Sequence, residues 1–172
     1  MEEITNKVKN SGIITIDLTD YLPQNEIIEI DLAQNLWQGL VLKEKDFRTY
    51  IAEENWAKFQ GKIATIFCSA DAIIPTWAYM LVASSLVDYA TEIYVGNKAE
   101  ATIKYVSKQI EQLNEADFSE ARVVIKGCAA IENPETLFLE LTTKLRPVVK
   151  SLMYGEPCST VPVYKKKKEE TR

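Results

Sequence analysis

The sequence predicts an α/β fold, a three-layer sandwich with helices on both faces of a mainly parallel sheet. Two observations predict it. Strand-like and helix-like segments alternate regularly from residue 62 onward, which is typical of a parallel sheet covered by helices. The chain has 172 residues, of which 47% are hydrophobic and 26% are charged, so one substantial core can form. We expect residues 1–172 to form a single domain with flexible ends at about 1–10 and 165–172.

The N-terminal region predicts two short strands and a helix. The runs GIITIDL (12–18) and EIIEIDL (26–32) are rich in β-branched residues, and a turn-like segment separates them. Both runs end in Asp-Leu, but two short runs do not make a repeat array. We expect these strands to extend one edge of the sheet, with an antiparallel orientation left open. Helical spacing of apolar residues then predicts a helix over about 45–54.

Three strand–helix pairs follow. The predicted order is strand 62–68, helix 75–90, strand 92–96, helix 98–113, strand 121–127 and helix 133–145. Pro75 and Pro134 stand in the first turns of two of these helices, where a missing N–H is harmless, and Asn133 is a natural N-cap. Right-handed crossovers bring the C-terminal ends of the three strands to one edge of the sheet. Ligands bind at that edge in such folds.

The segment after residue 145 has two interpretations. Apolar residues recur at spacings of three and four from Leu137 to Leu152, which suits one long helix. Pro147 opposes this helix, because proline disfavours helical geometry at the preceding residue and costs about 3 kcal/mol inside a helix. If the helix stops there, residues 148–155 form a fourth parallel strand. We favour the strand, which brings Cys158 to the same edge as the other cysteines.

Composition excludes several classes of function. A net charge of −5 disfavours general nucleic-acid binding. The first residues contain no apolar run, so no secretory signal is expected, and the longest apolar stretch (72–87) is shorter than the roughly 20 residues of a membrane helix. Three cysteines without a signal favour a cytoplasmic location, where thiols stay reduced. The chain has no histidine, which excludes imidazole metal sites and His-dependent catalytic pairs built from this chain alone.

The three cysteines are the candidate functional residues. Cys68 and Cys128 each end a predicted strand. If these strands are neighbours where the strand order reverses, the two thiols lie close together, and Cys158 joins them if 148–155 is a strand. Three thiolates would suit zinc or an iron–sulfur cluster. The carboxylates within four residues of a cysteine are Asp71, Glu132 and Glu156, and we include Glu156 as a candidate metal ligand.

Other interpretations of the cysteines stay open. Free cysteine is among the most buried residue types, so the thiols can be ordinary core residues. In an enzyme alternative, Cys68 is a nucleophile activated by the following helix N-terminus. The amides of the 69–75 loop would then stabilise charge, and Asp71 would act as acid or base. A third hypothesis is a non-catalytic protein that self-associates through its helix faces.

The helix 75–90 offers a candidate ligand-binding surface. Trp77, Tyr79 and Met80 could line a pocket. Aromatic residues in a helix this apolar are usually core residues, and we favour the core interpretation.

Four stretches resemble a known family. They are GLVLKEKDFR, CSADAIIPTWAYMLV, KGC and MYGEPCSTVPVYK, and they resemble an uncharacterised family of small bacterial cytosolic proteins, a domain of unknown function. The resemblance spans about Ile13 to Lys166. It implies one complete protein whose cysteine-bearing segments belong to the family pattern, and an association with iron–sulfur assembly. It implies no activity.

The predicted function is therefore cytoplasmic binding of zinc or an iron–sulfur cluster through Cys68, Cys128 and Cys158. The site would have a structural or a sulfur- and metal-handling role. A second copy of the chain and a metal- or sulfur-trafficking protein are compatible partners. Neither a membrane nor a nucleic acid is expected as a partner.

Overall fold

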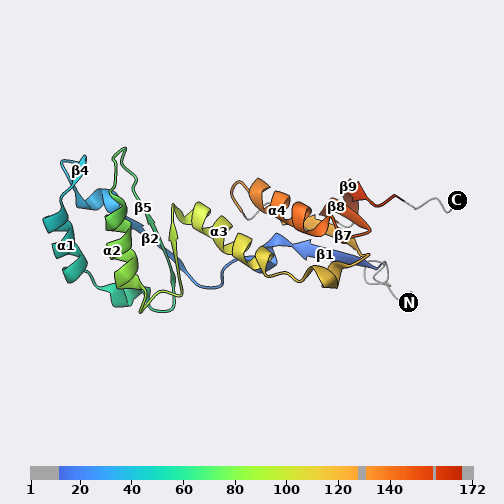
Figure 1. The fold of residues 1–172 in the computed structure, drawn as a ribbon, viewed down its shortest axis with the longest axis horizontal. Coiled ribbons are helices and arrows are strands. Elements are labelled where there is room, and N and C mark those ends of the chain that lie inside the picture. Colours follow the sequence, from blue (N-terminus) through green and yellow to red (C-terminus); the bar gives the residue numbers. More distant parts are fainter. Residues whose placement is uncertain (1–11, 128–130, 157, 168–172) are drawn as a thin grey trace, which may run out of the picture. The chain divides into compact units, whose positions relative to one another are not determined.

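Figure 1 shows the protein as a computed structural model that describes residues 12–127, 131–156 and 158–167. The chain divides into two compact units. Unit 2 contains Pro23–Lys104, and unit 1 contains the chain up to Leu22 and from Tyr105 onward. Each unit has its own mainly parallel sheet with helices, so the α/β fold class is confirmed. A single domain over 1–172 stays a prediction.

Unit 2 is built on a parallel sheet of order β2-β5-β6. Its strands are β2 (Ile27–Asp31), β5 (Ile63–Phe67) and β6 (Glu92–Val95), and its main helices are α1 (Glu44–Glu53) and α2 (Thr76–Leu86). Both helices cover one face of the sheet (Figure 1), because both right-handed crossovers step in the same direction. Phe47 of α1, Val82 of α2 and Ile66 of β5 are buried in the core that the two helices and the sheet share. The smaller elements are β3 (Leu36–Trp37), β4 (Val41–Leu42), η2 (Leu32–Asn35) and η3 (Trp56–Phe59).

Unit 1 is built on a sheet of order β1-β7-β8-β9. Its strands are β1 (Ile13–Asp17), β7 (Arg122–Lys126), β8 (Ser151–Glu156) and β9 (Ser159–Lys165). The first three are parallel, and β9 returns antiparallel to β8 as a hairpin. The other elements are η1 (Leu18–Tyr21), η4 (Glu115–Phe118), α4 (Glu135–Leu145) and α3 (Lys98–Glu111), which contains the boundary between the units. Leu137, Leu141 and Leu145 of α4 are fully buried, and they anchor the helix.

The two units repeat one arrangement of elements. β5 and α2 recur as β7 and α4 with unchanged lengths, 59 residues later (122 − 63 = 59 and 135 − 76 = 59). Ile27 pairs with Ile63 in one sheet, and Ile13 pairs with Arg122 in the other. β1 and β2 therefore hold equivalent positions in the same register. The two runs ending in Asp-Leu, interpreted above as too short for a repeat, are the equivalent strands of two repeated units.

The strand arrangement corrects two sequence predictions. β5 and β7 lie in different sheets, because each pairs with its own N-terminal strand. The prediction that these two strands are neighbours is wrong. The N-terminal strands extend an edge in each of two sheets rather than one shared edge, and both are parallel to their partners.

The end of α4 confirms the role predicted for Pro147. The helix ends at Leu145, and the following chain returns as β8, parallel to β7. The start of the helix differs from the prediction, because Pro134 occupies the N-cap position and Asn133 has a φ of 50°. The hairpin strand β9 was not predicted. It is an exposed edge strand that contains Pro162, a residue that strands tolerate mainly at edges.

Candidate ligand pocket and strand-end clusters

A pocket of about 510 Å³ opens in unit 1 between α4 and the strands β7, β8 and β9. Its apolar walls are formed by Ile125, Phe138, Leu139, Leu152, Met153 and Val163. The remaining lining residues are Pro134, Glu135, Thr142 and Tyr154. Leu139 is 66% exposed and Val163 is 52% exposed. Their apolar side chains are therefore accessible to a ligand.

One face of α4 forms the first wall of the pocket. Glu135, Phe138, Leu139 and Thr142 are spaced three, one and three residues apart, which places them along one side of a helix. The fully buried leucines on the neighbouring stripe hold the helix against the core of the unit. The orientation of this wall thus follows from the apolar pattern of the helix.

The β8–β9 hairpin forms the second wall. Leu152 is fully buried, and Tyr154 lies two residues further along the same face of β8. The Tyr154 ring meets the Phe138 ring edge to face, with centroids 5.3 Å apart and planes at 73°. Gly155 has a φ of +110°, and a Cβ there would lie 2.9 Å from the Ser159 carbonyl oxygen. Glycine is therefore required at position 155 for the end of β8 to lie this close to the start of β9.

The polar groups of the pocket are few. Within the part of the chain that the structure describes, Glu135 is the one charged residue that lines the pocket. Its side chain is exposed in the first turn of α4, where the helix dipole favours a carboxylate. No described residue forms an ion pair or hydrogen bond with this carboxylate. The Thr142 hydroxyl adds a neutral donor and acceptor on the same wall.

The equivalent helix in unit 2 carries the residues predicted to line a pocket. Tyr79 and Met80 stand 59 residues before Phe138 and Leu139 in the sequence. Trp77 and Tyr79 pack against the apolar core of unit 2, and Met80 is 67% exposed. The favoured core interpretation of the two aromatic residues is confirmed. The pocket lies instead at the corresponding helix of unit 1.

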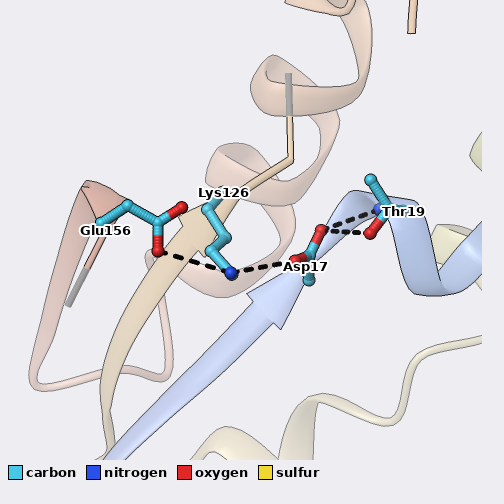
Figure 2. Close-up of polar contacts among 4 residues, drawn as sticks. All are labelled: Asp17, Thr19, Lys126 and Glu156. Atoms are coloured by element: carbon cyan, nitrogen blue, oxygen red, sulfur yellow. Dashed lines mark hydrogen bonds and ion pairs between the residues drawn. The ribbon is translucent and has the colours of Figure 1, made fainter. Parts of the chain in front are cut away.

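A polar cluster joins the ends of three neighbouring strands in unit 1 (Figure 2). The Lys126 ammonium at the end of β7 lies 3.1 Å from the Asp17 carboxylate and 3.4 Å from the Glu156 carboxylate. Asp17 also accepts hydrogen bonds from the Thr19 hydroxyl at 2.7 Å and from the Thr19 N–H at 3.0 Å. The Thr19 hydroxyl and, more weakly, Lys126 lower the pKa of Asp17. Asp17 raises the pKa of Lys126, with a smaller effect from Glu156.

Unit 2 has an equivalent carboxylate at the end of β2. Asp31 accepts hydrogen bonds from the Ser69 N–H at 3.0 Å, the Ser69 hydroxyl at 2.6 Å and the Ala33 N–H at 2.9 Å. Burial alone would raise the pKa of Asp31, but the hydrogen bonds from Ser69 and Ala33 outweigh it and lower the pKa. In both units the Asp of the Asp-Leu run caps a 3-10 turn and ties two strand ends together.

The described cysteines belong to different sheets. Cys68 follows β5 in unit 2, where it is half-buried and its thiol donates to the Ala70 carbonyl at 3.5 Å. Cys158 is exposed in the turn between β8 and β9 of unit 1. Cys128 lies outside the described residues. The three-cysteine site requires that the strands preceding the cysteines are parallel neighbours in one sheet. β7 and β8 meet this condition, whereas β5 belongs to the other sheet.

The predicted oxygen ligands are surface residues. Asp71 and Glu132 are exposed, and Glu156 pairs with Lys126. Among the residues that the structure describes, no group of three or more Cys, Asp or Glu side chains is placed to hold a metal ion.

Comparison with known proteins identifies the family of the chain. The family model described as "Protein of unknown function (DUF2480)" matches residues 2–166. The chain belongs to this family. No curated protein matches the sequence, and no solved structure matches it. Among the described helices, none combines the length and apolarity that a bilayer-spanning segment requires. Membership of the family brings no activity, so the proposal for function depends on the geometry of the site.

Sequence reasoning missed the pocket. Its lining residues come from α4 and a hairpin that includes the unpredicted β9. The signal available in the sequence was the 59-residue correspondence, which aligns the predicted surface of Tyr79 and Met80 with Phe138 and Leu139.

Proposed function

We propose that this protein is a binding protein for a small, mainly apolar ligand, held in the pocket between α4 and the β8–β9 hairpin. The apolar pocket of about 510 Å³ carries this proposal. Binding sites for small molecules are commonly clefts of about 300–1,000 Å³ with apolar walls and a few polar groups. The pocket has this size and this composition.

The lining supports binding rather than catalysis. Among the residues that the structure describes, the lining contains one carboxylate, Glu135, and no thiol, amine or second carboxylate that would complete a nucleophile-and-base pair. The apolar side chains can exclude water from a ligand, which is favourable by about 25 cal/mol per Å² of apolar surface buried. A cytoplasmic location is part of the proposal, since the chain keeps three cysteines without a pattern of disulfide pairs.

The test uses diphenylhexatriene, a neutral apolar probe whose fluorescence rises when it leaves water. We expect saturable binding to the wild-type protein with one probe per chain. Leu139→Glu should weaken binding at least about tenfold, because it places a charge against the apolar probe. The matched control is Met80→Glu, which alters an equally exposed residue at the equivalent position of unit 2. It should leave binding unchanged.

Two results would contradict the proposal. One is the absence of saturable binding by the wild-type protein. The other is an equal effect of Leu139→Glu and Met80→Glu, or no effect of either, because the probe would then bind elsewhere. Circular dichroism spectra of both variants would show that the fold is retained.

A second candidate function is binding of zinc or an iron–sulfur cluster at the C-terminal edge of the unit 1 sheet. One observation favours it: β7 and β8 are parallel neighbours, and the sequence places Cys128 and Cys158 two residues after the paired side chains Lys126 and Glu156. Glu156 is the candidate oxygen ligand, and a metal- or sulfur-trafficking protein would be the partner. Cys68 completes the three-cysteine version of this proposal.

Elemental analysis and a visible spectrum of protein purified anaerobically without a metal-affinity tag test this candidate. Near-stoichiometric zinc or iron that is lost in Cys158→Ser and Cys128→Ser supports it. Retention of the metal in Cys68→Ser would restrict the site to unit 1. Metal-free wild-type protein would contradict it.

A further inference from the structure

We propose that the ligand of the pocket is an organic cation, a protonated or quaternary amine carried on an apolar body. Its charged group would lie beside the Glu135 carboxylate and the aromatic rings of Phe138 and Tyr154. This inference rests on the proposed function, because it names the ligand class of the same pocket.

The charge of the pocket is the first argument. Glu135 is the one charged side chain among the described residues of the lining, and no described residue pairs with it. A ligand cation would supply the missing counter-charge, whereas a carboxylate or phosphate would be repelled. The carboxylate also lies on the same helix face as Phe138, three residues away. One ligand group can therefore reach both side chains.

The aromatic pair is the second argument. The Phe138 and Tyr154 rings are arranged edge to face, with centroids 5.3 Å apart. A cation is attracted to the face of an aromatic ring, and recognition of quaternary ammonium groups commonly uses aromatic side chains. The aliphatic walls formed by Leu139 and Val163 suit the apolar remainder of the ligand.

Two basic residues near the sheet are engaged with other groups, which is the third argument. Lys126 lies between the carboxylates of Asp17 and Glu156 (Figure 2). The Arg146 guanidinium lies over the Tyr164 ring, 4.9 Å from its centroid. Neither residue lines the pocket. The described lining therefore offers negative charge and aromatic surface, and no positive charge to an anion.

The experiment compares three probes that share one apolar body: diphenylhexatriene, its trimethylammonium derivative and its propionic acid derivative. We expect the wild-type protein to bind the cationic probe about tenfold more tightly than the neutral one, from the carboxylate and aromatic contacts together. The anionic probe should bind most weakly. The preference should shrink as salt rises from 0.02 to about 0.5 M, because exposed charges are screened.

Variants assign the preference to Glu135. Glu135→Gln should reduce the cationic preference to about threefold or less while leaving the neutral probe unaffected. Glu135→Lys should reverse it in favour of the anionic probe. The matched control is Glu53→Gln, which removes an exposed carboxylate from α1 in unit 2 and should leave all three affinities unchanged.

The outcomes separate this inference from the proposed function. Binding of the neutral probe without cationic preference, or a cationic preference of about tenfold that is undiminished in Glu135→Gln, overturns the ligand class and leaves the pocket in place. Failure of all three probes to bind overturns both.

Discussion

Substitution of Asp17 tests the strand-end cluster of unit 1. The carboxylate accepts bonds from the Thr19 N–H at 3.0 Å and hydroxyl at 2.7 Å, and it lies 3.1 Å from the Lys126 ammonium. Asp17→Ala removes all three interactions. Asp17→Asn keeps a side chain that caps the 3-10 turn and removes the charge. The pair of variants therefore separates the cap from the ion pair.

The magnitude follows from these contacts. Loss of an N-cap side chain typically costs about 1 kcal/mol. The ion pair is partly exposed, with side chains 22% and 28% accessible, so screening by solvent keeps its contribution below that of the cap. We expect Asp17→Ala to destabilise unit 1 by up to about 2 kcal/mol at pH 7, roughly thirtyfold in the opening equilibrium. Asp17→Asn should cost about 0.5–1 kcal/mol.

The pH dependence has a defined sign. Since the folded protein lowers the pKa of Asp17, mainly through the Thr19 hydroxyl, ionisation stabilises the folded state above the unfolded value of about 3.9. This contribution is lost as the pH falls through the folded pKa. The difference between the wild-type protein and Asp17→Asn should thus be present at pH 7 and disappear toward about pH 2–3.

Hydrogen exchange measured by mass spectrometry resolves the affected segments. Peptides of β1 and β7 should exchange up to about thirtyfold faster in Asp17→Ala than in the wild-type protein at the same pH. The matched variant Asp31→Ala should accelerate β2 and β5 instead, because Asp31 ties those strand ends together. Unchanged exchange of β1 and β7 in Asp17→Ala would refute this account, as would an Asp17→Asn effect that persists at pH 2.

Three further predictions follow from burial and backbone geometry. Leu141→Ala should lower the free energy of unfolding by about 2–5 kcal/mol, because Leu141 is fully buried. Leu139 is 66% exposed, so Leu139→Ala should change the free energy of unfolding by no more than about 0.5 kcal/mol. Urea denaturation of both variants measures the difference. Gly127→Ala should be among the most destabilising substitutions by the same assay, because φ is +103° and a Cβ would lie 2.5 Å from the Asp17 carboxylate. Burial, with a smaller effect of Glu54, raises the pKa of Tyr50 to about 12. The neutral phenol therefore stabilises the fold fully below pH 10, and this contribution should be lost between pH 10 and 12. Tryptophan fluorescence should show this loss of stability in the wild-type protein but not in Tyr50→Phe.

Local sequence signals predicted most of the regular elements. The strand 62–68 is observed as β5 (Ile63–Phe67), and 121–127 as β7 (Arg122–Lys126). Pro147 predicted the end of α4 and the return of the chain as a strand, because the stereochemistry of proline acts on its immediate neighbours. The prediction that Asn133 is the N-cap is wrong, because Asn133 has a left-handed φ and Pro134 occupies the N-cap position. The composition of the segment does not reveal this backbone conformation.

The sequence by itself determined the α/β class, the element boundaries to within a few residues and the chemistry excluded by the absence of histidine. Hydrophobic periodicity, the positions of prolines and composition are properties of the sequence itself, so they can be analysed without a structure. Only the tertiary structure decided which strands pair. The hydrogen bonds of a parallel sheet join residues far apart in the chain, and β5 and β7 have nearly the same burial pattern, with buried residues at their centres. Because β5 pairs with β2 and β7 pairs with β1, Cys68 and Cys158 follow strands of different sheets. Packing of α4 against a hairpin formed the pocket.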